Sequence, residues 1–399
     1  MGSSSNHGAR RIAPGIWVLG FVSLLMDVSS ELIHSLLPVF LWVGLGTSAL
    51  TIGLIEGVAE STALIVKMFS GTLSDYLGRR KALAVVGYGL GALSKPLFAI
   101  AGSGGMVFMA RLVDRMGKGI RGAPRDALIA DLSPREARGS AYGLRQALDT
   151  LGAFLGPLLA MGLMLLTAND FRAVFWMAVI PGGLSVALLV VGVRDPPRAP
   201  QEHREKPIHW RNVGRLSRAY WWVVGVGTAF SLARFSEAFL VLRAQQAGLP
   251  LAGVPLVLVA MNLVYAVSAY PFGRLADAVS HGRLLRVGLT ALIAADCVLA
   301  WGESWQALAP GIALWGLHLG ITQGLLATMV ANTAPPELRG TAFGFFNLLC
   351  GLALLVASAL AGLLWDQLGA SAPFYGGALL GLLALALVAL GGRREPALA

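Results

Sequence analysis

Ionisable side chains occur at helical spacing inside long apolar segments of this sequence. In the segment 16–42, Asp27, Glu31 and His34 follow one another at intervals of four and three residues. At 3.6 residues per turn, these side chains lie within about 60° of one helix face and spread over about 10 Å of its length. Carboxyl and imidazole groups can bind and release protons. Because such residues are costly inside a membrane, they usually mark a pathway for ions or substrates.

Neighbouring apolar segments place further charges one helical turn apart. This spacing predicts charged stripes on three more helices. The residues are Glu56 and Glu60 in segment 49–70, Arg111, Arg115 and Lys118 in segment 105–131, and Arg145 and Asp149 in segment 139–167. The second half of the chain is much poorer in such residues, with Arg234 and Glu237 as its main pair. We therefore expect ion coupling to belong to the first half of the chain.

Two interpretations of these stripes remain open. In the first, the helices pair their charges permanently, and the pairs only hold the helices together. In the second, at least one carboxyl group gains and loses a proton during a cycle. Asp27 and Glu31 are then the first candidates, with His34 as a relay and with Glu56 and Glu60 beside them. We favour the second interpretation.

A second set of side chains is expected to line a central cavity and to contact a substrate. The basic members would either neutralise the carboxyl groups or attract an anionic part of the substrate, and the sequence favours neither role. The polar members suit hydrogen bonds to a solute. The set consists of Arg111, Arg115, Lys118, Arg145, Asp149, Arg234, Glu237, Asn262, Tyr265 and Asn347.

The composition requires that these segments cross a membrane. Of the 399 residues, 56% are hydrophobic and only 13% are charged, whereas soluble proteins contain about 25% charged residues. The apolar runs have the length of spanning helices, and a β-barrel would show alternating segments of about ten residues. We therefore predict an all-α membrane protein with twelve transmembrane helices. The predicted spans are 16–42, 49–70, 82–101, 105–131, 139–167, 171–193, 219–243, 250–272, 284–302, 305–331, 338–364 and 371–392.

The net charge of +10 is explained by short basic loops that fall on one side of the predicted membrane. Such loops face the cytoplasm, so both termini and the Pro-rich charged linker are expected there, in the cytoplasmic (inner) membrane. This distribution argues against a nucleic-acid partner. Cys297 and Cys350 both lie in apolar runs, so we expect no disulfide framework.

The two halves of the sequence repeat one another. Residues 133–143 match residues 334–344 at six of eleven positions, with an offset of 201. Residues 71–75 match residues 273–277 at nearly the same offset. An offset of six helices preserves the direction of each helix, so the repeats are parallel and enclose a central cavity. The predicted domains are an N-terminal six-helix bundle (1–193), a linker (194–218) and a C-terminal six-helix bundle (219–399).

Three motifs resemble those of the major facilitator superfamily. The segment 71–81, GTLSDYLGRRK, resembles the signature between that superfamily's second and third helices. Arg115 with Gly119 is similar to its pattern in the fourth helix, and residues 152–157, GAFLGP, resemble its antiporter motif in the fifth helix. The resemblance implies two six-helix bundles that work by alternating access, and a monomer.

The residue types in segment 71–81 also suggest, on physical grounds, that this segment forms a gate. The glycines permit a tight turn between two helices, the aspartate can cap a neighbouring helix, and the basic residues anchor at lipid headgroups. We expect this loop to hold the cytoplasmic side closed in the outward-facing state. The candidate gating residues are Gly71, Asp75, Gly78, Arg79, Arg80, Gly152, Gly156, Pro157 and Asp277.

The leading functional hypothesis is a proton-coupled exporter, an antiporter that moves a small organic solute, with an anionic solute as one option. One alternative is a divalent metal-ion exporter that uses Asp27, Glu31 and His34 as ligands. Another is a non-transporting sensor built on a transporter fold. An enzyme is not expected, because neither an HExxH motif nor a phosphate-binding loop is present. No cofactor or resident metal is predicted, and the expected partners are the solute, protons and the lipid bilayer.

Overall fold

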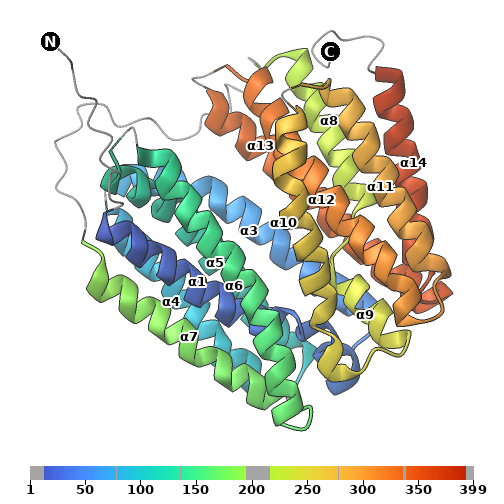
Figure 1. The fold of residues 1–399 in the computed structure, drawn as a ribbon, viewed down its shortest axis with the longest axis horizontal. Helices are drawn as coiled ribbons and strands as arrows, with labels where there is room; N and C mark the ends of the chain where they lie inside the picture. The colour runs from blue at the N-terminus through green and yellow to red at the C-terminus, as the bar shows by residue number, and fades with distance from the viewer. Residues whose placement is uncertain are drawn as a thin grey trace, which may run out of the picture.

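The computed structural model describes residues 13–77, 79–134, 137–194, 216–276, 278–335 and 338–391. Within these ranges every regular element is a helix, and the helices form two groups, one from each half of the chain (Figure 1). The prediction of an all-α fold is confirmed. The end of the molecule at which α1 begins and α14 finishes is called the terminal end below, and the other is called the opposite end.

The first group contains seven α-helices and one short π-helical turn. Helix α1 is followed directly by the short α2 and the π turn, and the remaining helices alternate in direction. The bounds are α1 Pro14–His34, α2 Leu37–Val39, η1 Phe40–Gly44, α3 Ala49–Leu77, α4 Arg80–Ile100, α5 Gly104–Leu132, α6 Arg138–Leu166 and α7 Phe171–Gly192.

The second group repeats this arrangement. Helix α8 is followed by the short α9, and a single 3₁₀ turn precedes α10. The bounds are α8 Arg218–Ala233, α9 Ala238–Gln246, η4 Leu251–Gly253, α10 Leu256–Ala276, α11 His281–Trp301, α12 Trp305–Thr333, α13 Arg339–Leu368 and α14 Ala372–Gly391.

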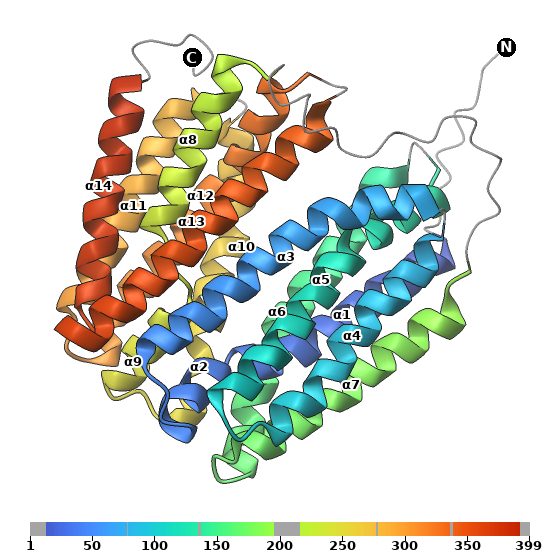
Figure 2. The same cartoon turned by 180° about the vertical axis from the view of Figure 1, so that it is seen from behind.

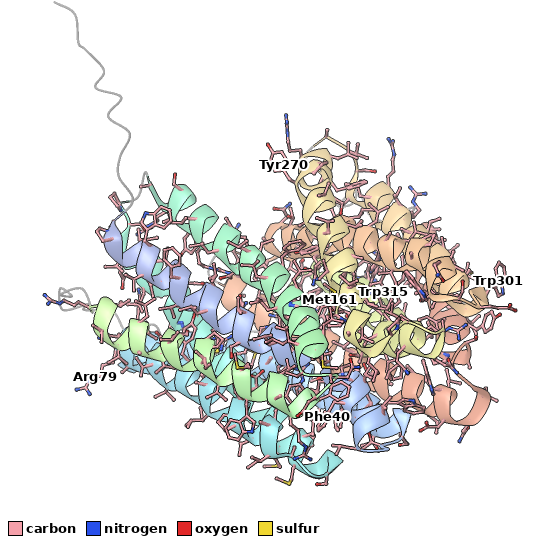
Figure 3. The ribbon with its side chains drawn as sticks, turned by 60° about the horizontal axis from the view of Figure 1, so that its bottom comes forward. Phe40, Arg79, Met161, Tyr270, Trp301 and Trp315 are labelled. Atoms are coloured by element: carbon pink, nitrogen blue, oxygen red, sulfur yellow. The ribbon has the colours of Figure 1, made fainter. Side chains whose placement is uncertain are left out.

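Eleven of the described segments are long and apolar enough to cross a membrane. Helix α5 has 29 residues and packs against α3 and α4, but its many charged side chains keep it out of that set. Its charges face neighbouring helices, so α5 completes the twelve spans that the sequence predicts. Aromatic side chains such as Tyr270 and Trp301 project from the surface, whereas Trp315 lies inside the second group (Figure 3).

Two of the predicted spans are interrupted, which corrects the prediction of continuous helices over 16–42 and 219–243. In the first, α1 ends at His34, and the turn at Ser35 and Leu36 precedes Pro38. In the second, α8 ends at Ala233, and residues 234–237 are not helical before α9. Pro38 has no N–H group to donate to the carbonyl oxygen of His34, four residues earlier, and a proline ring clashes with that carbonyl in a continuous helix, which accounts for the first break. Interrupted helices of this kind commonly form binding sites in transporters.

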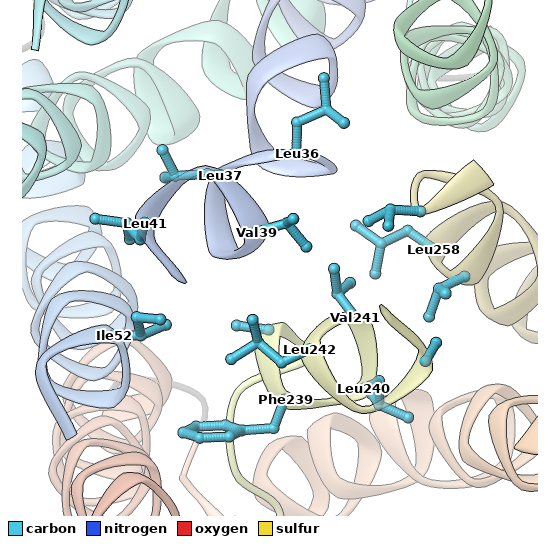
Figure 4. Packing of buried hydrophobic residues seen from close by; sticks show 14 of the residues in the cluster. Leu36, Leu37, Val39, Leu41, Ile52, Phe239, Leu240, Val241, Leu242 and Leu258 are labelled. Carbon is cyan, nitrogen blue, oxygen red and sulfur yellow. The ribbon is translucent and has the colours of Figure 1, made fainter. Parts of the chain in front are cut away.

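Among the described residues, the apolar core joins the two groups at one end only. At the opposite end, Val39 of α2 faces Val241 of α9 and Leu258 of α10 within one continuous buried cluster (Figure 4). At the terminal end, the buried apolar residues form two separate clusters, one confined to residues 16–193 and one to residues 216–388. The halves are therefore sealed together at the opposite end.

Helices α3 and α13 form the longest contact between the two groups and run antiparallel, side by side (Figure 2). Small residues permit this close approach. A Cβ atom at Gly57 would lie 3.0 Å from the Cα atom of Leu355. One turn further along α3, the Ser61 hydroxyl donates a hydrogen bond of 2.6 Å to the carbonyl oxygen of Gly351. The contact thus depends on the absence of a side chain at Gly57.

Gly57→Leu is expected to lower the apparent melting temperature in detergent by about 1–4 °C, because overpacking costs about 1–3 kcal/mol. Gly89→Leu is the matched control, since a Cβ atom at Gly89 of α4 meets nothing within 4 Å. Fluorescence-monitored thermal unfolding measures both variants. An equal decrease in the two variants would contradict the importance of the α3–α13 contact.

Candidate substrate cavity

A cavity of about 290 Å³ lies between the two halves. Its wall combines apolar side chains, such as Pro38, Leu258 and Leu354, with a large number of ionisable ones. Nine residues that the sequence singled out lie together in this wall. They are Glu31, His34, Glu56, Glu60, Arg111, Arg115, Lys118, Arg234 and Glu237.

Both interrupted spans contribute to this wall at their breaks. Glu31 and His34 occupy the last turn of α1. In the other half, the whole non-helical segment 234–237 lines the cavity, and Glu237 is the residue directly before α9. The breaks therefore bring charged side chains from both halves to one volume.

The charged stripes of α3 and α5 face one another as ion pairs. Arg111 Nη2 lies 2.5 Å from Glu56 Oε2 and 3.6 Å from Glu60 Oε1. Arg115 Nη1 lies 3.4 Å from Glu60 Oε1. The helices approach closely because Gly119 has no side chain, and the Ser70 hydroxyl donates a hydrogen bond of 2.9 Å to the Gly119 carbonyl. Because Arg111 and Arg115 are nearly fully buried, these pairs compensate the cost of desolvation.

Arg115 also holds the imidazole ring of His34. Its Nη2 atom lies 2.7 Å from Nδ1 of His34. The same Nη2 atom lies 2.9 Å from Nε2 of His34. A guanidinium group can only donate hydrogen bonds, so one of the two ring nitrogens accepts from Arg115. His34 is therefore oriented at the end of α1 by a residue of α5, and Nε2 lies 3.5 Å from Asp114 Oδ2.

Other charges in the wall have no such compensation. Among the described residues, Lys118, Arg234 and Glu237 have no ion-pair partner within 4 Å, and Glu31 approaches only His34, at 3.7 Å. Lys118 belongs to the first half, whereas Arg234 and Glu237 belong to the second. These four side chains are the charges that the cavity offers to a ligand.

Three predicted residues form a separate charged cluster that is not part of the cavity wall. Asp27 Oδ1 lies 3.8 Å from Arg121 Nη2. Arg145 donates hydrogen bonds to Asp149 one turn away and lies 3.2 Å from Asp126. Asp27 is thus one turn removed from the wall that contains Glu31 and His34.

The remaining predicted polar residues also lie outside the lining. The hydroxyl of Tyr265 donates a hydrogen bond of 3.1 Å to Gln323 Oε1, and Gln323 does line the cavity. Tyr265 is therefore connected to the wall through a second residue. Asn262 and Asn347 are not among the lining residues.

The gating motif is only partly described. Gly78 and Asp277 lie outside the described residues, and Gly71 and Asp75 are described only as part of the backbone of α3. Arg79 is exposed before α4 and projects from the surface (Figure 3). Arg80 Nη1 lies 2.5 Å from Asp131 Oδ2 and donates to the carbonyl oxygen of Ala127 at 3.0 Å. Arg80 thus connects the start of α4 to the end of α5.

Gly152 and Gly156 lie directly behind the carboxyl groups of α1. A Cβ atom at Gly152 would lie 3.0 Å from the Cβ atom of Asp27, and one at Gly156 would displace Glu31. Pro157 follows inside α6. These two glycines therefore set how far Asp27 and Glu31 extend from the α1–α6 contact.

The most deeply buried ion pair was missed by the sequence analysis. Lys95 Nζ donates to Asp114 Oδ1 at 2.7 Å and to Ser30 Oγ at 3.0 Å, and both charged residues are almost fully buried. A lysine in the middle of the span 82–101 was a visible signal, but its partner on another helix was not. The pair joins α4 to α5 behind the cavity wall.

The repeat offset of 201 places Asp296 at the position of Lys95, and Trp315 at that of Asp114. Asp296 is fully buried, and within the described residues neither carboxyl oxygen has a hydrogen-bond partner. The indole nitrogen of Trp315 is also buried without a partner there. The second half thus contains an isolated acidic group where the first half contains an ion pair.

The proposed metal ligands do not form a metal site in the described part of the chain. No group of three His, Cys, Asp or Glu side chains there has suitable geometry. In addition, the guanidinium group of Arg115 contacts both ring nitrogens of His34, one of which a metal ion would need.

A charged cavity enclosed by two groups of spanning helices, sealed at one end, defines a membrane transport protein. The comparison with known families agrees: the Major Facilitator Superfamily model matches residues 19–260 and 237–399. The chain belongs to this superfamily, so the resemblance found in the sequence motifs is confirmed.

Relatives and solved structures give the same result. The chain is 30% identical over 369 residues to an uncharacterized MFS-type transporter, MJ1317, of Methanocaldococcus jannaschii, covering 90% of this chain and 91% of that protein. It is 29% identical over 184 residues to the quinolone resistance protein NorA of Staphylococcus aureus, covering 46% of each. Its fold matches an inward-facing bacterial homolog of the human lysosomal transporter Spinster, with a TM-score of 0.75 at 15% identity over 95% of this chain and 96% of that one.

Asp114→Asn is expected to lower the apparent melting temperature markedly, because it leaves the buried Lys95 charge without its partner, at a cost of about 3–5 kcal/mol. Asp296→Asn at the equivalent position should leave the melting temperature unchanged or raise it, because the carboxyl group that it removes has no partner. Thermal unfolding of the two variants in one detergent tests the contrast. A larger decrease for Asp296→Asn would contradict the assignment of the paired and the isolated position.

Proposed function

We propose that the protein is a proton-coupled antiporter that exports a small organic solute by alternating access. The observation that supports this most directly is the cavity wall, in which Glu31 has no cationic partner within 4 Å and lies in the same small volume as the unpaired Lys118 and Arg234. A carboxyl group without a compensating cation can exchange a proton, and a free cation can bind an anionic group. One cavity therefore contains both functions that coupling requires.

The proton site that we propose is Glu31, with Asp27 one turn further along α1 as a second position. Glu56 and Glu60 are less suitable because Arg111 and Arg115 already neutralise them. His34 is held by Arg115 through an accepting ring nitrogen. In this proposal His34 positions the end of α1 and does not relay protons, which differs from the role predicted from the sequence.

The solute contacts that we propose are Lys118 and Arg234. They come from opposite halves, so an anionic group bound between them would contact both moving parts. Glu237 adjoins Arg234 in the break between α8 and α9 and offers a site for a cationic part of the same solute. A cavity of about 290 Å³ restricts the solute to a small molecule.

The direction of transport and the orientation are part of the proposal. The basic loops favour an orientation with the terminal end in the cytoplasm, in which the sealed end faces outward. The partial similarity to NorA supports export. We propose that the protein acts as a monomer in the cytoplasmic membrane, with residues 194–218 as the linker between the two six-helix domains.

Glu31→Gln is expected to abolish solute-driven proton movement while solute exchange between the two sides continues, because only the proton site is lost. The assay uses liposomes with an acidic lumen, an internal pH dye and a panel of small organic anions, cations and zwitterions. In an antiporter, adding a transported solute outside raises the internal pH as protons leave. Glu303→Gln, which alters an exposed carboxyl group in the α11–α12 loop, is the control. A full response in both Glu31→Gln and Asp27→Asn would refute the proton assignment.

Lys118→Gln and Arg234→Gln should each reduce solute affinity by tenfold or more for an anionic solute, because a charge-assisted hydrogen bond contributes about 1.5–3 kcal/mol. Binding of the solute identified above, measured calorimetrically in detergent, tests this. Arg283→Gln, on the exposed start of α11, is the control for lost positive charge. Unchanged affinity in both cavity variants would exclude them as solute contacts.

A further inference from the structure

Asp366 connects the two halves of the transporter through backbone hydrogen bonds. It lies near the end of α13, and its carboxylate accepts hydrogen bonds from the backbone N–H groups of Ala49 and Leu50. Both bonds measure 2.9 Å, one to each carboxylate oxygen. Ala49 and Leu50 are the first two residues of α3, in the other half of the chain. A side chain of one half thus caps a helix of the other.

This cap has the chemistry of a helix N-terminus. The first N–H groups of a helix have no partner within the helix, and the aligned peptide dipoles favour a negative charge there. At the start of α3, the N–H groups are capped by residues from both halves. The hydroxyl of Ser48, within the first half, accepts a hydrogen bond of 3.2 Å from the N–H group of Thr51. The two preceding N–H groups depend on Asp366. Without it, those two donors would have to find other partners, such as water.

The position of the cap ties it to the sealed end of the molecule. Trp365, next to Asp366, packs against Trp42 with ring centroids 6.2 Å apart. One turn before, Gly362 leaves no room for a side chain because α3 begins directly against it. The continuous apolar cluster that joins the halves lies at this same end. The hydrogen bonds can therefore persist only while the two halves are closed here.

The sequence offers a counterpart at the other end of the same helix pair. Asp366 stands two residues before the end of α13 at Leu368, and Asp75 stands two residues before the end of α3 at Leu77. The two helices run antiparallel, so each has an aspartate at the end where the other begins. Asp75 belongs to the motif for which the sequence analysis predicts a gate on the cytoplasmic side.

We propose that Asp366 is the lock of the outer gate: its carboxylate caps α3 when the transporter is open to the cytoplasm, and releases it when the outer side opens. The inference rests on the proposed alternating-access transport, and it adds the residue that selects one of the two states. Because the bonded carboxylate is exposed rather than buried, the lock is weak enough to break in each cycle.

The test measures distances between the halves at both ends by pulsed electron spin resonance, in liposomes and without solute. Spin labels at Gly102 and Glu303 report the outer end, and labels at Ala82 and Arg283 report the inner end. Each pair occupies exposed positions related by the repeat offset. Cys297 and Cys350 are first replaced by alanine, because they are the only native cysteines.

Asp366→Ala is expected to increase the ratio of outward-open to inward-open molecules about fivefold, the effect of losing one helix cap. The outer distance should lengthen and the inner distance should shorten in the same molecules. Asp170→Ala is the matched control. Asp170 caps α7 at the same end by accepting from Arg172 and Ala173, but entirely within one half.

Unchanged distance distributions in Asp366→Ala would overturn the proposal, as would an equal shift in Asp170→Ala. General loosening, seen as broader distributions at both ends without opposite changes, would also overturn it. The measurement requires neither a solute nor a proton gradient. A failure of the proton assignment would therefore appear only in the liposome assay with Glu31→Gln, and would leave this result interpretable.

Discussion

Arg111 and Arg115 lie in the interior of the first half with 3% and 2% of their surfaces exposed. Charges in such a place are tolerated only when opposite charges and hydrogen bonds compensate the loss of water. This requirement accounts for much of the architecture around the cavity. The two arginines need the carboxylates of α3 opposite them, and α3 can approach α5 closely enough only because residue 119 is a glycine. The side chains left outside these pairs are the ones that can respond to a solute or a proton.

The same requirement explains why the two halves differ despite their common origin in a repeat. In the first half, Lys95 and Asp114 join α4 to α5 behind the cavity wall. In the second half, the equivalent positions hold Asp296 and Trp315, and the helices are held together mainly by apolar packing. A half with an ion-pair network and a half with an apolar core suit different tasks. An ion-pair network suits the proposed coupling of protons to solute movement. An apolar core suits a cavity wall that moves as a rigid unit.

Two kinds of contact between the halves stand out, the glycine-mediated packing of α3 against α13 and the hydrogen bonds of Asp366. Glycines allow α3 and α13 to touch along their length, and a single carboxylate completes the junction at the start of α3. Neither contact involves a buried charge whose separation would be costly. A transporter must close each end firmly and still open it in every cycle, and packing of small residues with an exposed helix cap meets both conditions.

The helical class, the twelve spans, the repeat and the superfamily could all be predicted from the amino-acid sequence, because apolar length and spacing are local properties. The sequence also predicted nine of the charged residues that line the cavity, because charges at helical spacing inside apolar runs are visible without a structure. Which of these charges are neutralised became visible only in the packed helices. Glu60 faces Arg115, Lys118 faces no carboxylate within 4 Å, and Asp27 lies outside the wall. The tertiary structure alone located the break at residues 234–237 and the cap by Asp366. Partners that are 55 to 317 residues apart in the sequence meet only through the packing of whole helices, and that packing leaves no local signal.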